Sequence, residues 1–221
     1  MHDFLRLLAP HIHLVAIPTD SRSAPVGAWF GDDVDAAATW AAGWNAAHAG
    51  VYWTVNVVRA GLHAKPTKAD IVAVRAAHCD VDDTRDVDRL RAYAPSVIVD
   101  SGNGLQPVWW LSEPCDADTV EAINRGLVAA LGGDKACWNV DRLLRLPGLI
   151  NWPNAIKQAR GKVAVPTAIA QPDGGLRYAP SSLQAAFPAP ARTTRETDTE
   201  HGPWEAIALD DMTPPLPADV L

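Results

Sequence analysis

The sequence predicts a domain of the α/β or α+β class, in which strands alternate with helices. Three observations support this prediction: short runs of branched apolar residues typical of strands, longer stretches with helical periodicity, and turn-forming glycines and prolines between them. The chain has 221 residues, of which 48% are hydrophobic and 20% are charged. It is therefore long enough to bury one sizeable core, which excludes a disordered chain and a disulfide-stapled miniprotein.

The first part of the chain predicts three strands and one helix. The acidic pair Asp32 and Asp33 is suited to cap an alanine-rich helix that continues to His48, because carboxylates accept the free N–H groups of a first helical turn. Trp40 and Trp44 are four residues apart on one face of this helix, which we expect to face the core. Strands are expected at residues 11–18, 26–30 and 51–58.

The alternation continues through the rest of the predicted domain. A helical turn is expected near Thr67. Acidic residues in the first turn, with Gly132 and Gly133 as the stop, make residues 116–131 the clearest helix in the chain. We expect an apolar run at 72–83, a charged helix at 84–94, a tight turn at 101–104, and strands at 96–99, 108–111, within 142–154 and at 163–169.

The charge is unevenly distributed along the chain. The formal net charge is −7, and residues 185–221 alone hold seven acidic and two basic residues, together with six of the 18 prolines. The remainder is thus close to neutral, so a local phosphate-binding face is compatible with the composition. We predict a domain over residues 1–184 and a mobile, Pro-rich acidic linker or tail over residues 185–221.

Cysteine usage and hydropathy indicate an intracellular protein. The three cysteines are widely spaced and form no CxxC pair, so we expect reduced structural thiols. No apolar run is long enough to span a membrane, and the start of the chain is too short and too polar for a signal peptide. We therefore expect a cytoplasmic protein with no membrane partner.

The sharpest chemical signal is the run His78-Cys79-Asp80-Val81-Asp82-Asp83. Residues two apart in a strand face the same side, so Asp80 and Asp82 would present two carboxylates together. Like charges held this close repel each other, and a divalent cation is the usual compensation. The alternative is a solvated strand end that caps the next helix.

Two further segments contain candidate ligands. Backbone N–H groups of the turn at Ser101 and Gly102 can hold phosphate oxygens, although such a turn is more often a plain hairpin. After the clearest helix, Asp134 could supply a third carboxylate, with Asp141 as the competing third acid; either can instead be a loop cap. Arg142 and Arg145 could bind triphosphate or template phosphates.

Taken together and in this order, the three segments resemble the primase domain of RepB-like proteins and of phage and plasmid primase-polymerases, in the archaeo-eukaryotic primase superfamily. That family has an acidic hDhD strand, a SGxG segment ending in His or sometimes Gln, and a third Asp before an RxxRLPG stretch. The chain has CDVDD, SGNGLQPVWWL, and GGD followed by RLLRLPGLINWPN. Gln106 takes the place of the usual His, which removes one source of charge next to the nucleotide phosphates.

The resemblance implies a primase-type catalytic domain with an RRM-like mixed or antiparallel sheet flanked by helices. It implies metal-dependent nucleotidyl transfer that makes primers from NTPs or dNTPs on a single-stranded DNA template. The context would be the replication of a phage, plasmid or other mobile element. A helicase or a further domain C-terminal to this segment could be a partner. Two ions, Mg²⁺ or Mn²⁺, would be held by Asp80, Asp82 and Asp134. The nucleotide would be bound by Ser101, Gly102, Gln106, Arg142 and Arg145, and DNA by Lys157, Arg160 and Lys162.

Other readings of the same residues remain open. Trp109 and Trp110 alternate across a strand, so one is expected in the core and the other could stack on a base. His11 and His13 form a His-hydrophobic-His pair on a predicted strand, which could serve an HUH-type nicking endonuclease. Gln106 suggests a third possibility, a degenerate non-catalytic module that binds single-stranded DNA.

Overall fold

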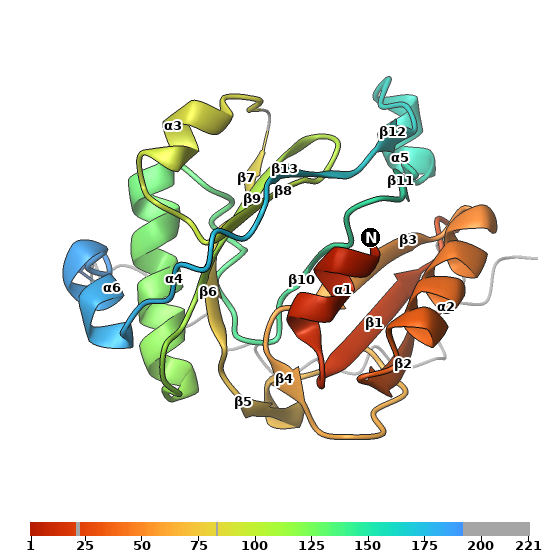
Figure 1. The fold of residues 1–221 in the computed structure, drawn as a ribbon. Helices are drawn as coiled ribbons and strands as arrows, with labels where there is room; N and C mark the ends of the chain where they lie inside the picture. The colour runs from red at the N-terminus through yellow and green to blue at the C-terminus, as the bar shows by residue number, and fades with distance from the viewer. Residues whose placement is uncertain (21–22, 83, 192–221) are drawn as a thin grey trace, which may run out of the picture. The chain divides into compact units, whose positions relative to one another are not determined.

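The computed structural model describes residues 1–20, 23–82 and 84–191. Residues Met1–Pro190 form one compact unit, with which the following description is concerned (Figure 1). Most of the predicted tail, residues 192–221, lies outside the described residues. A helix runs from Pro180 to Ala186 and therefore crosses the predicted boundary between residues 184 and 185. The division into a domain and a tail stays a prediction.

One sheet of the unit has four antiparallel strands in the order β10-β3-β1-β2. Leu14 of β1 lies between Ala28 of β2 and Trp53 of β3, and Trp53 in turn pairs with Leu144 of β10. The edge position of β10 brings a late segment of the chain beside an early strand. The strands are β1 (Ile12–Ile17), β2 (Val26–Gly31), β3 (Gly50–Thr54) and β10 (Leu143–Arg145).

The second sheet has the order β13-β8-β9-β6, and β7 also pairs with β9. His78 pairs with Val108 and Val81 with Leu105, so the break between β6 and β7 leaves the register intact and places Asp80 opposite Gln106. The strands of this sheet are β6 (Ala76–His78), β7 (Val81–Asp82), β8 (Val97–Asp100), β9 (Gly104–Trp110) and β13 (Ala168–Gln171). Two small antiparallel pairs are separate from both sheets: β4 (Val57–Val58) with β5 (Ile71–Ala73), and β11 (Ile150–Asn151) with β12 (Val165–Pro166).

The helices begin where the sequence supplies caps. The carboxylates of Asp33, Asp86 and Asp116 each accept the N–H three residues later, and Gly132 ends the longest helix in the left-handed conformation, with φ of 71°. The helices are α1 (His2–Leu8), α2 (Val34–Ala46), α3 (Val87–Arg91), α4 (Ala117–Leu131), α5 (Ala155–Ala159) and α6 (Pro180–Ala186), with a 3₁₀ turn η1 (Lys68–Asp70).

Two apolar clusters cover the two faces of the second sheet. Ala76, Val108 and Trp110 point towards the four-stranded sheet and pack with residues of α1 and α2, whereas Ala77 and Trp109 point towards α4. Figure 1 shows α4 on one side of β6, β8 and β9 and α1 with β1 and β3 on the other. Because side chains alternate across a strand, polar residues in phase with Ala76 face the space between the two sheets.

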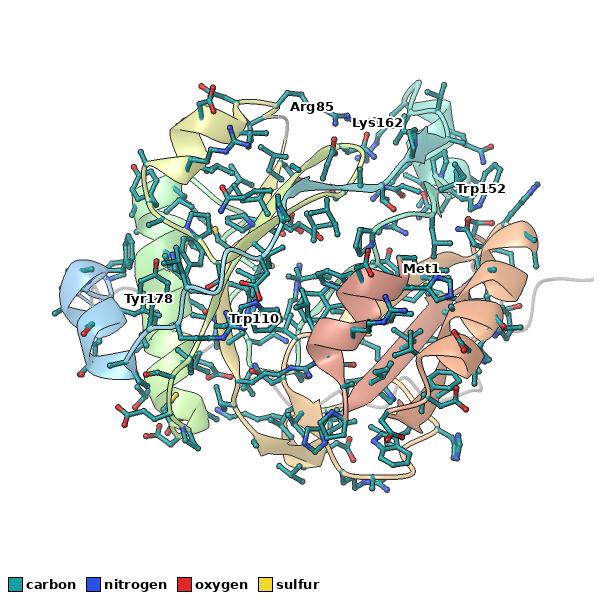
Figure 2. All side chains as sticks on the ribbon, viewed as in Figure 1. Met1, Arg85, Trp110, Trp152, Lys162 and Tyr178 are labelled. Carbon is teal, nitrogen blue, oxygen red and sulfur yellow. The ribbon has the colours of Figure 1, made fainter. Side chains whose placement is uncertain are left out.

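The predicted fold class is confirmed, and each expected strand and helix contains an observed element. The strand expected at residues 51–58 is divided into β3 and β4, and α1, α5 and α6 were not anticipated. The expectation that either Trp109 or Trp110 could stack on a base is wrong. Trp109 is 0% exposed and Trp110 is 5% exposed, so both lie in the interior (Figure 2). Among the described residues, no helix is long and apolar enough to cross a membrane.

Candidate active site

Asp80 is the centre of the candidate site. It lies in the break between β6 and β7, and it is in phase with Ala76, so it faces the space between the two sheets. The side chain of Gln106, opposite on β9, donates a hydrogen bond to Asp80. Gln106 also accepts the backbone N–H of Arg145 at 2.9 Å. One buried amide therefore joins the acidic strand to β10.

The environment of Asp80 disfavours its negative charge. Burial, and then the charge of Asp82, raise the pKa of Asp80 from 3.8 to about 6; Asp134 adds to this effect, while Gln106 and Arg142 oppose it. The Oδ1 atom of Asp80 is buried and has no hydrogen-bond partner among the described residues. A buried carboxylate oxygen without a donor is costly, and a cation at this oxygen would remove the cost.

A backbone hydrogen bond holds Asp134 next to Asp80. Its N–H donates to the carbonyl oxygen of Asp80 at 2.8 Å. The preceding residue must be glycine, because a Cβ at Gly133 would overlap the sulfur of Cys79. The Asp134 carboxylate pairs with Arg142 at 3.6 Å. Asp141, the competing third acid, instead accepts a hydrogen bond from the side chain of Asn139.

The donor set suits a hard divalent cation. Asp80 and Asp82 supply carboxylate oxygens, the ligands that Mg²⁺ and Mn²⁺ prefer, and the unpartnered Oδ1 of Asp80 is available as a ligand. In the described part of the chain, no three or more His, Cys, Asp or Glu side chains form a group that could hold a metal ion. The acids that face the site therefore fit a cation as a pair, and Asp134 is adjacent to that pair.

A second feature of the site is the buried guanidinium of Arg145. Arg145 is 9% exposed and lies over the ring of Tyr52 at 4.2 Å. Within the described part of the chain its Nη1 has no hydrogen-bond partner, and burial lowers the pKa of Arg145. A Cβ at position 50 would overlap this nitrogen, so replacement of Gly50 would force the guanidinium to move. The charge of Asp80 acts on this guanidinium from a distance, and among the described residues Nη1 itself is not hydrogen-bonded, which favours an anion as its ligand.

Arg145 lines a small pocket of about 80 Å³. Tyr52 and Lys157 also line it, so the pocket has a second cation at its border. Both polar and apolar groups surround the space, which is large enough for a small anionic group but not for a nucleoside. The remaining lining residues are Ile17, Pro18, Thr19, Gly50, Trp152 and Asn154.

The turn at 101–104 uses the backbone groups that were expected to bind phosphate. The N–H of Ser101 donates to the carbonyl of Gly104 at 2.9 Å, and the N–H of Gly102 donates to Asp100 at 2.7 Å. The side chain of Asn151 donates to the carbonyl of Ser101 at 2.8 Å. The nucleotide-binding role of Ser101 and Gly102 stays a prediction, and it requires these amides to exchange partners.

The basic residues expected to contact DNA lie on or just after α5. Lys157, Arg160 and Lys162 are all exposed. They follow β11, and Lys157 borders the Arg145 pocket, so this basic segment begins next to the candidate site. Figure 2 shows Lys162 and Trp152 in the same region of the molecule.

The two histidines of the alternative motif have different environments. His11 is exposed, just before β1, whereas His13 is 1% exposed and its Nδ1 lies 2.7 Å from the hydroxyl of Thr54. Burial lowers the pKa of His13 to about 4, so this ring is neutral at physiological pH. The geometry therefore does not present them as one exposed metal-binding pair.

Several residues of the site were not singled out from the sequence. Gly50 and Tyr52 shape the Arg145 pocket, and Gln106 proves to be a bridge between the two sheets as well as a neighbour of Asp80. The only signal for Gly50 and Tyr52 is their place in a strong strand run, which any buried strand would share.

Comparison with known proteins identifies a family and three similar structures. Residues 37–171 match the family described as the RepB DNA-primase N-terminal domain. A search of curated proteins found no match.

The three structures share the fold at low sequence identity. The AEP domain of the cyanophage S-2L primase-polymerase (PrimPol) is 18% identical with a TM-score of 0.62, over 85% of this chain and 95% of that one. Primase RepB′ is 15% identical with a TM-score of 0.58, over 83% of this chain and 60% of that one. The catalytic domain of primase RepB′ in complex with initiator DNA is 16% identical with a TM-score of 0.57, over 84% and 91%.

Proposed function

Because the chain belongs to the RepB DNA-primase N-terminal domain family, we propose that it is a DNA primase or primase-polymerase. The proposed reaction is metal-dependent joining of nucleotides into primers on single-stranded DNA, in the replication of a phage, plasmid or other mobile element. The observation that carries the proposal is the buried, unpartnered Oδ1 of Asp80, next to two more carboxylates. The similar structures include a primase-polymerase and a primase in complex with initiator DNA.

The acids form the proposed metal site. Asp80 and Asp82, with Asp134 as the preferred third acid, would hold Mg²⁺ or Mn²⁺. The chemistry supplied by the bound ions would be activation of a 3′ hydroxyl and neutralisation of charge on the α-phosphate and the pyrophosphate. The pKa of Asp80 without a bound cation is about 6, so below that pH a proton competes with the cation for this carboxylate. Gln106 orients the Asp80 carboxylate through its hydrogen bond.

The arginines form the proposed nucleotide site. Arg145 holds a donor, Nη1, ready for a phosphate oxygen, and the ring of Tyr52 beneath it restricts how the guanidinium can turn. Arg142 pairs with Asp134 at 3.6 Å, so its charge lies next to the acids, where it could also bind a phosphate of the nucleotide. Their charges compensate the triphosphate in place of the histidine that the family usually has at position 106.

The exposed Lys157, Arg160 and Lys162 form the proposed DNA contact. No acidic residue occurs between Ala155 and Gln171, so this segment is a basic stretch on an acidic chain. Such a segment would bind the phosphate backbone without regard to sequence, and its contribution would fall as salt is raised.

The test is primer synthesis on circular single-stranded DNA, with labelled NTPs or dNTPs and either Mg²⁺ or Mn²⁺. The wild type is compared with Asp80→Asn, and with Asp88→Asn as a matched control, because Asp88 is an exposed acid on α3 that pairs with Arg91 on the same helix. Products from the wild type and the control, and none from Asp80→Asn, are expected.

Other products would favour the alternatives. Cleaved template that is lost in His13→Gln would indicate a nicking endonuclease. DNA binding without synthesis or cleavage, unchanged in Asp80→Asn, would indicate a non-catalytic binding module and would refute the proposed reaction.

A further inference from the structure

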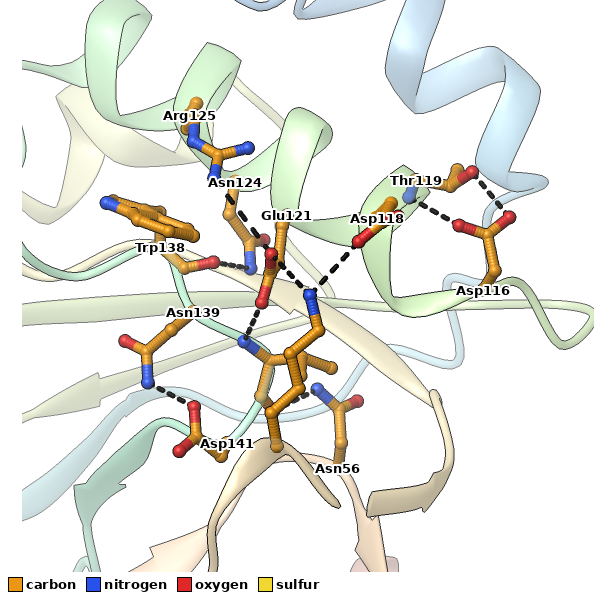
Figure 3. Close-up of polar contacts among 12 residues, drawn as sticks. Asn56, Asp116, Asp118, Thr119, Glu121, Asn124, Arg125, Trp138, Asn139 and Asp141 are labelled. Carbon is orange, nitrogen blue, oxygen red and sulfur yellow. Dashed lines mark hydrogen bonds and ion pairs between the residues drawn. The ribbon is translucent and has the colours of Figure 1, made fainter. Parts of the chain in front are cut away.

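The segment between Asp134 and β10 has no regular structure, and buried side chains hold its backbone instead (Figure 3). Glu121 Oε1 accepts the N–H of Val140 at 3.1 Å. The carbonyl of Val140 accepts from Asn56 at 2.9 Å, and the carbonyl of Trp138 accepts from Asn124 at 3.0 Å. Three side chains thus take the place of the ladder that a strand would have.

These three side chains are almost completely inaccessible. Asn124 is 0% exposed, Asn56 is 1% and Glu121 is 5%. Burial of a carboxamide or carboxylate is unfavourable unless its hydrogen bonds are made, so their presence in the interior is explained by the backbone groups that they bind.

Two of the same side chains also hold the strand that leads to Asp80. Asn124 Oδ1 accepts the N–H of His78 at 2.9 Å, and Asn56 Oδ1 accepts the N–H of Ala76 at 3.2 Å. His78 precedes Asp80 by two residues. Each asparagine therefore binds β6 through its oxygen and the irregular segment through its nitrogen.

The irregular segment carries two groups of the site at its ends. The N–H of Cys137 donates to the carbonyl of Asp134 at 2.9 Å, and the N–H of Arg142 donates to the carbonyl of Asn139 at 3.2 Å. These turns couple both residues to Trp138 and Val140. A shift of the segment would move Asp134 and Arg142 relative to Asp80.

The cations around Glu121 act on its charge and not on the segment's backbone. Lys68 Nζ contacts the other carboxylate oxygen, Oε2, at 3.0 Å and also contacts Asp118 at 3.0 Å. Arg125 lies 3.9 Å from the same Oε2. Anchoring of Val140 and neutralisation of Glu121 are therefore separable by mutation.

We propose that Asn56, Glu121 and Asn124 are positioning residues, which hold Asp134 and Arg142 at their distance from Asp80. The effect on catalysis rests on the proposed function, whereas the anchoring of the segment can be measured without any activity. Each of the three binds backbone groups of the irregular segment, and the two asparagines also bind backbone groups of β6, so the proposed effect on the site passes through the backbone.

The experiment compares Glu121→Ala, which removes the acceptor for Val140, with Glu121→Gln, which keeps an oxygen there and loses the charge. Lys68→Ala removes the ion pairs of Lys68 with Glu121 and Asp118 and leaves the acceptor for Val140 in place. Two quantities are measured: hydrogen exchange of the Asp134 amide, and the Mn²⁺ concentration that gives half-maximal primer synthesis. Exchange of the β8 and β9 amides reports whether each variant is folded, and Asn124→Ala tests the other end of the segment.

In Glu121→Ala and Asn124→Ala we expect faster exchange of the Asp134 amide and a requirement for about tenfold more Mn²⁺, with β8 and β9 still protected. Glu121→Gln and Lys68→Ala should resemble the wild type in both. Unchanged exchange and Mn²⁺ dependence in the two alanine variants would refute the positioning role while the proposed function stands. A wild type without primer synthesis would refute the proposed function, and the exchange measurement would still decide whether the segment is anchored.

Discussion

Gln106 Oε1 accepts the backbone N–H of Arg145 at 2.9 Å, which joins the second sheet to the edge strand of the first. The same side chain donates to Asp80. Gln106 is 4% exposed, so neither bond is readily replaced by water. The residue that departs from the family's usual histidine thus has a structural role between the acid and the arginine of the site.

Replacement of Gln106 by leucine should destabilise the fold. The change leaves the N–H of Arg145 buried without an acceptor, which costs about 1–3 kcal/mol. It also removes the hydrogen bond that lowers the pKa of Asp80, so that pKa should rise further. Urea unfolding measures the loss of stability, and NMR of the carboxyl groups measures the pKa of Asp80. Gln106→Glu keeps an acceptor for the Arg145 N–H, so at low pH this variant should be more stable than Gln106→Leu. Equal stability of wild type and Gln106→Leu would contradict the bridge.

Asp80→Asn should stabilise the metal-free protein in a pH-dependent way. The pKa of Asp80 is raised in the folded protein to about 6 from 3.8, so its favourable contribution is fully present below pH 4 and is lost as pH rises through 6. The gain from Asp80→Asn should therefore grow between pH 4 and 6.5 to at most about 3 kcal/mol. Urea unfolding in chelator at pH 4.5 and 7.5 checks this, with Asp88→Asn as the control; a gain that shrinks with rising pH would be inconsistent with the buried acid.

Divalent cations should stabilise the wild type through the same acids. A ligand that binds only the folded state raises the melting temperature, and a concentration 100 times the dissociation constant contributes about 2.7 kcal/mol. At pH 7.5 we expect Mn²⁺ to raise the melting temperature of the wild type and of Asp88→Asn, but not that of Asp80→Asn. An equal rise in all three would place the cation elsewhere.

The Arg145 pocket should bind an anionic phosphate group. Inorganic pyrophosphate should raise the melting temperature of the wild type, because it would pair with the buried Nη1. Gly50→Ala should weaken this effect, since the added Cβ overlaps the guanidinium, and Arg145→Met should abolish it. In primer synthesis the same variants should raise the nucleotide KM by about tenfold or more, at an unchanged Mn²⁺ requirement. Full pyrophosphate stabilisation of Arg145→Met would exclude this pocket as the site.

Local features of the sequence were sufficient for the elements that depend on neighbours along the chain. The caps at Asp33 and Asp116 and the stop at Gly132 lie where they were predicted, because each acts within one helical turn. The alternation that was expected to put Asp80 on one face of a strand is present in the register of β6 and β7 against β9. The resemblance of the acidic and RLPG segments to primases agrees with the family match.

The elements that sequence reasoning missed depend on distant contacts. Residues 2–8 read as a polar start, yet Phe4, Leu5 and Leu8 are fully buried between the sheets as part of α1. Trp110 has no sequence signal that distinguishes it from Trp109; both are buried because the four-stranded sheet covers Trp110 and α4 covers the face that carries Trp109.

The arrangement of the candidate site was likewise decided by tertiary structure. Spacing alone indicated that Asp80 and Asp82 are in phase and that Asp134 follows a helix, although a break between β6 and β7 contains Asp80. It did not determine that Asp134, rather than Asp141, comes next to Asp80, nor that Gln106 ties Asp80 to Arg145. Local pattern sets which residues share a face because alternation is a property of the backbone. Which faces meet is set by the burial of apolar surface from the whole chain, to which residues more than a hundred positions apart contribute.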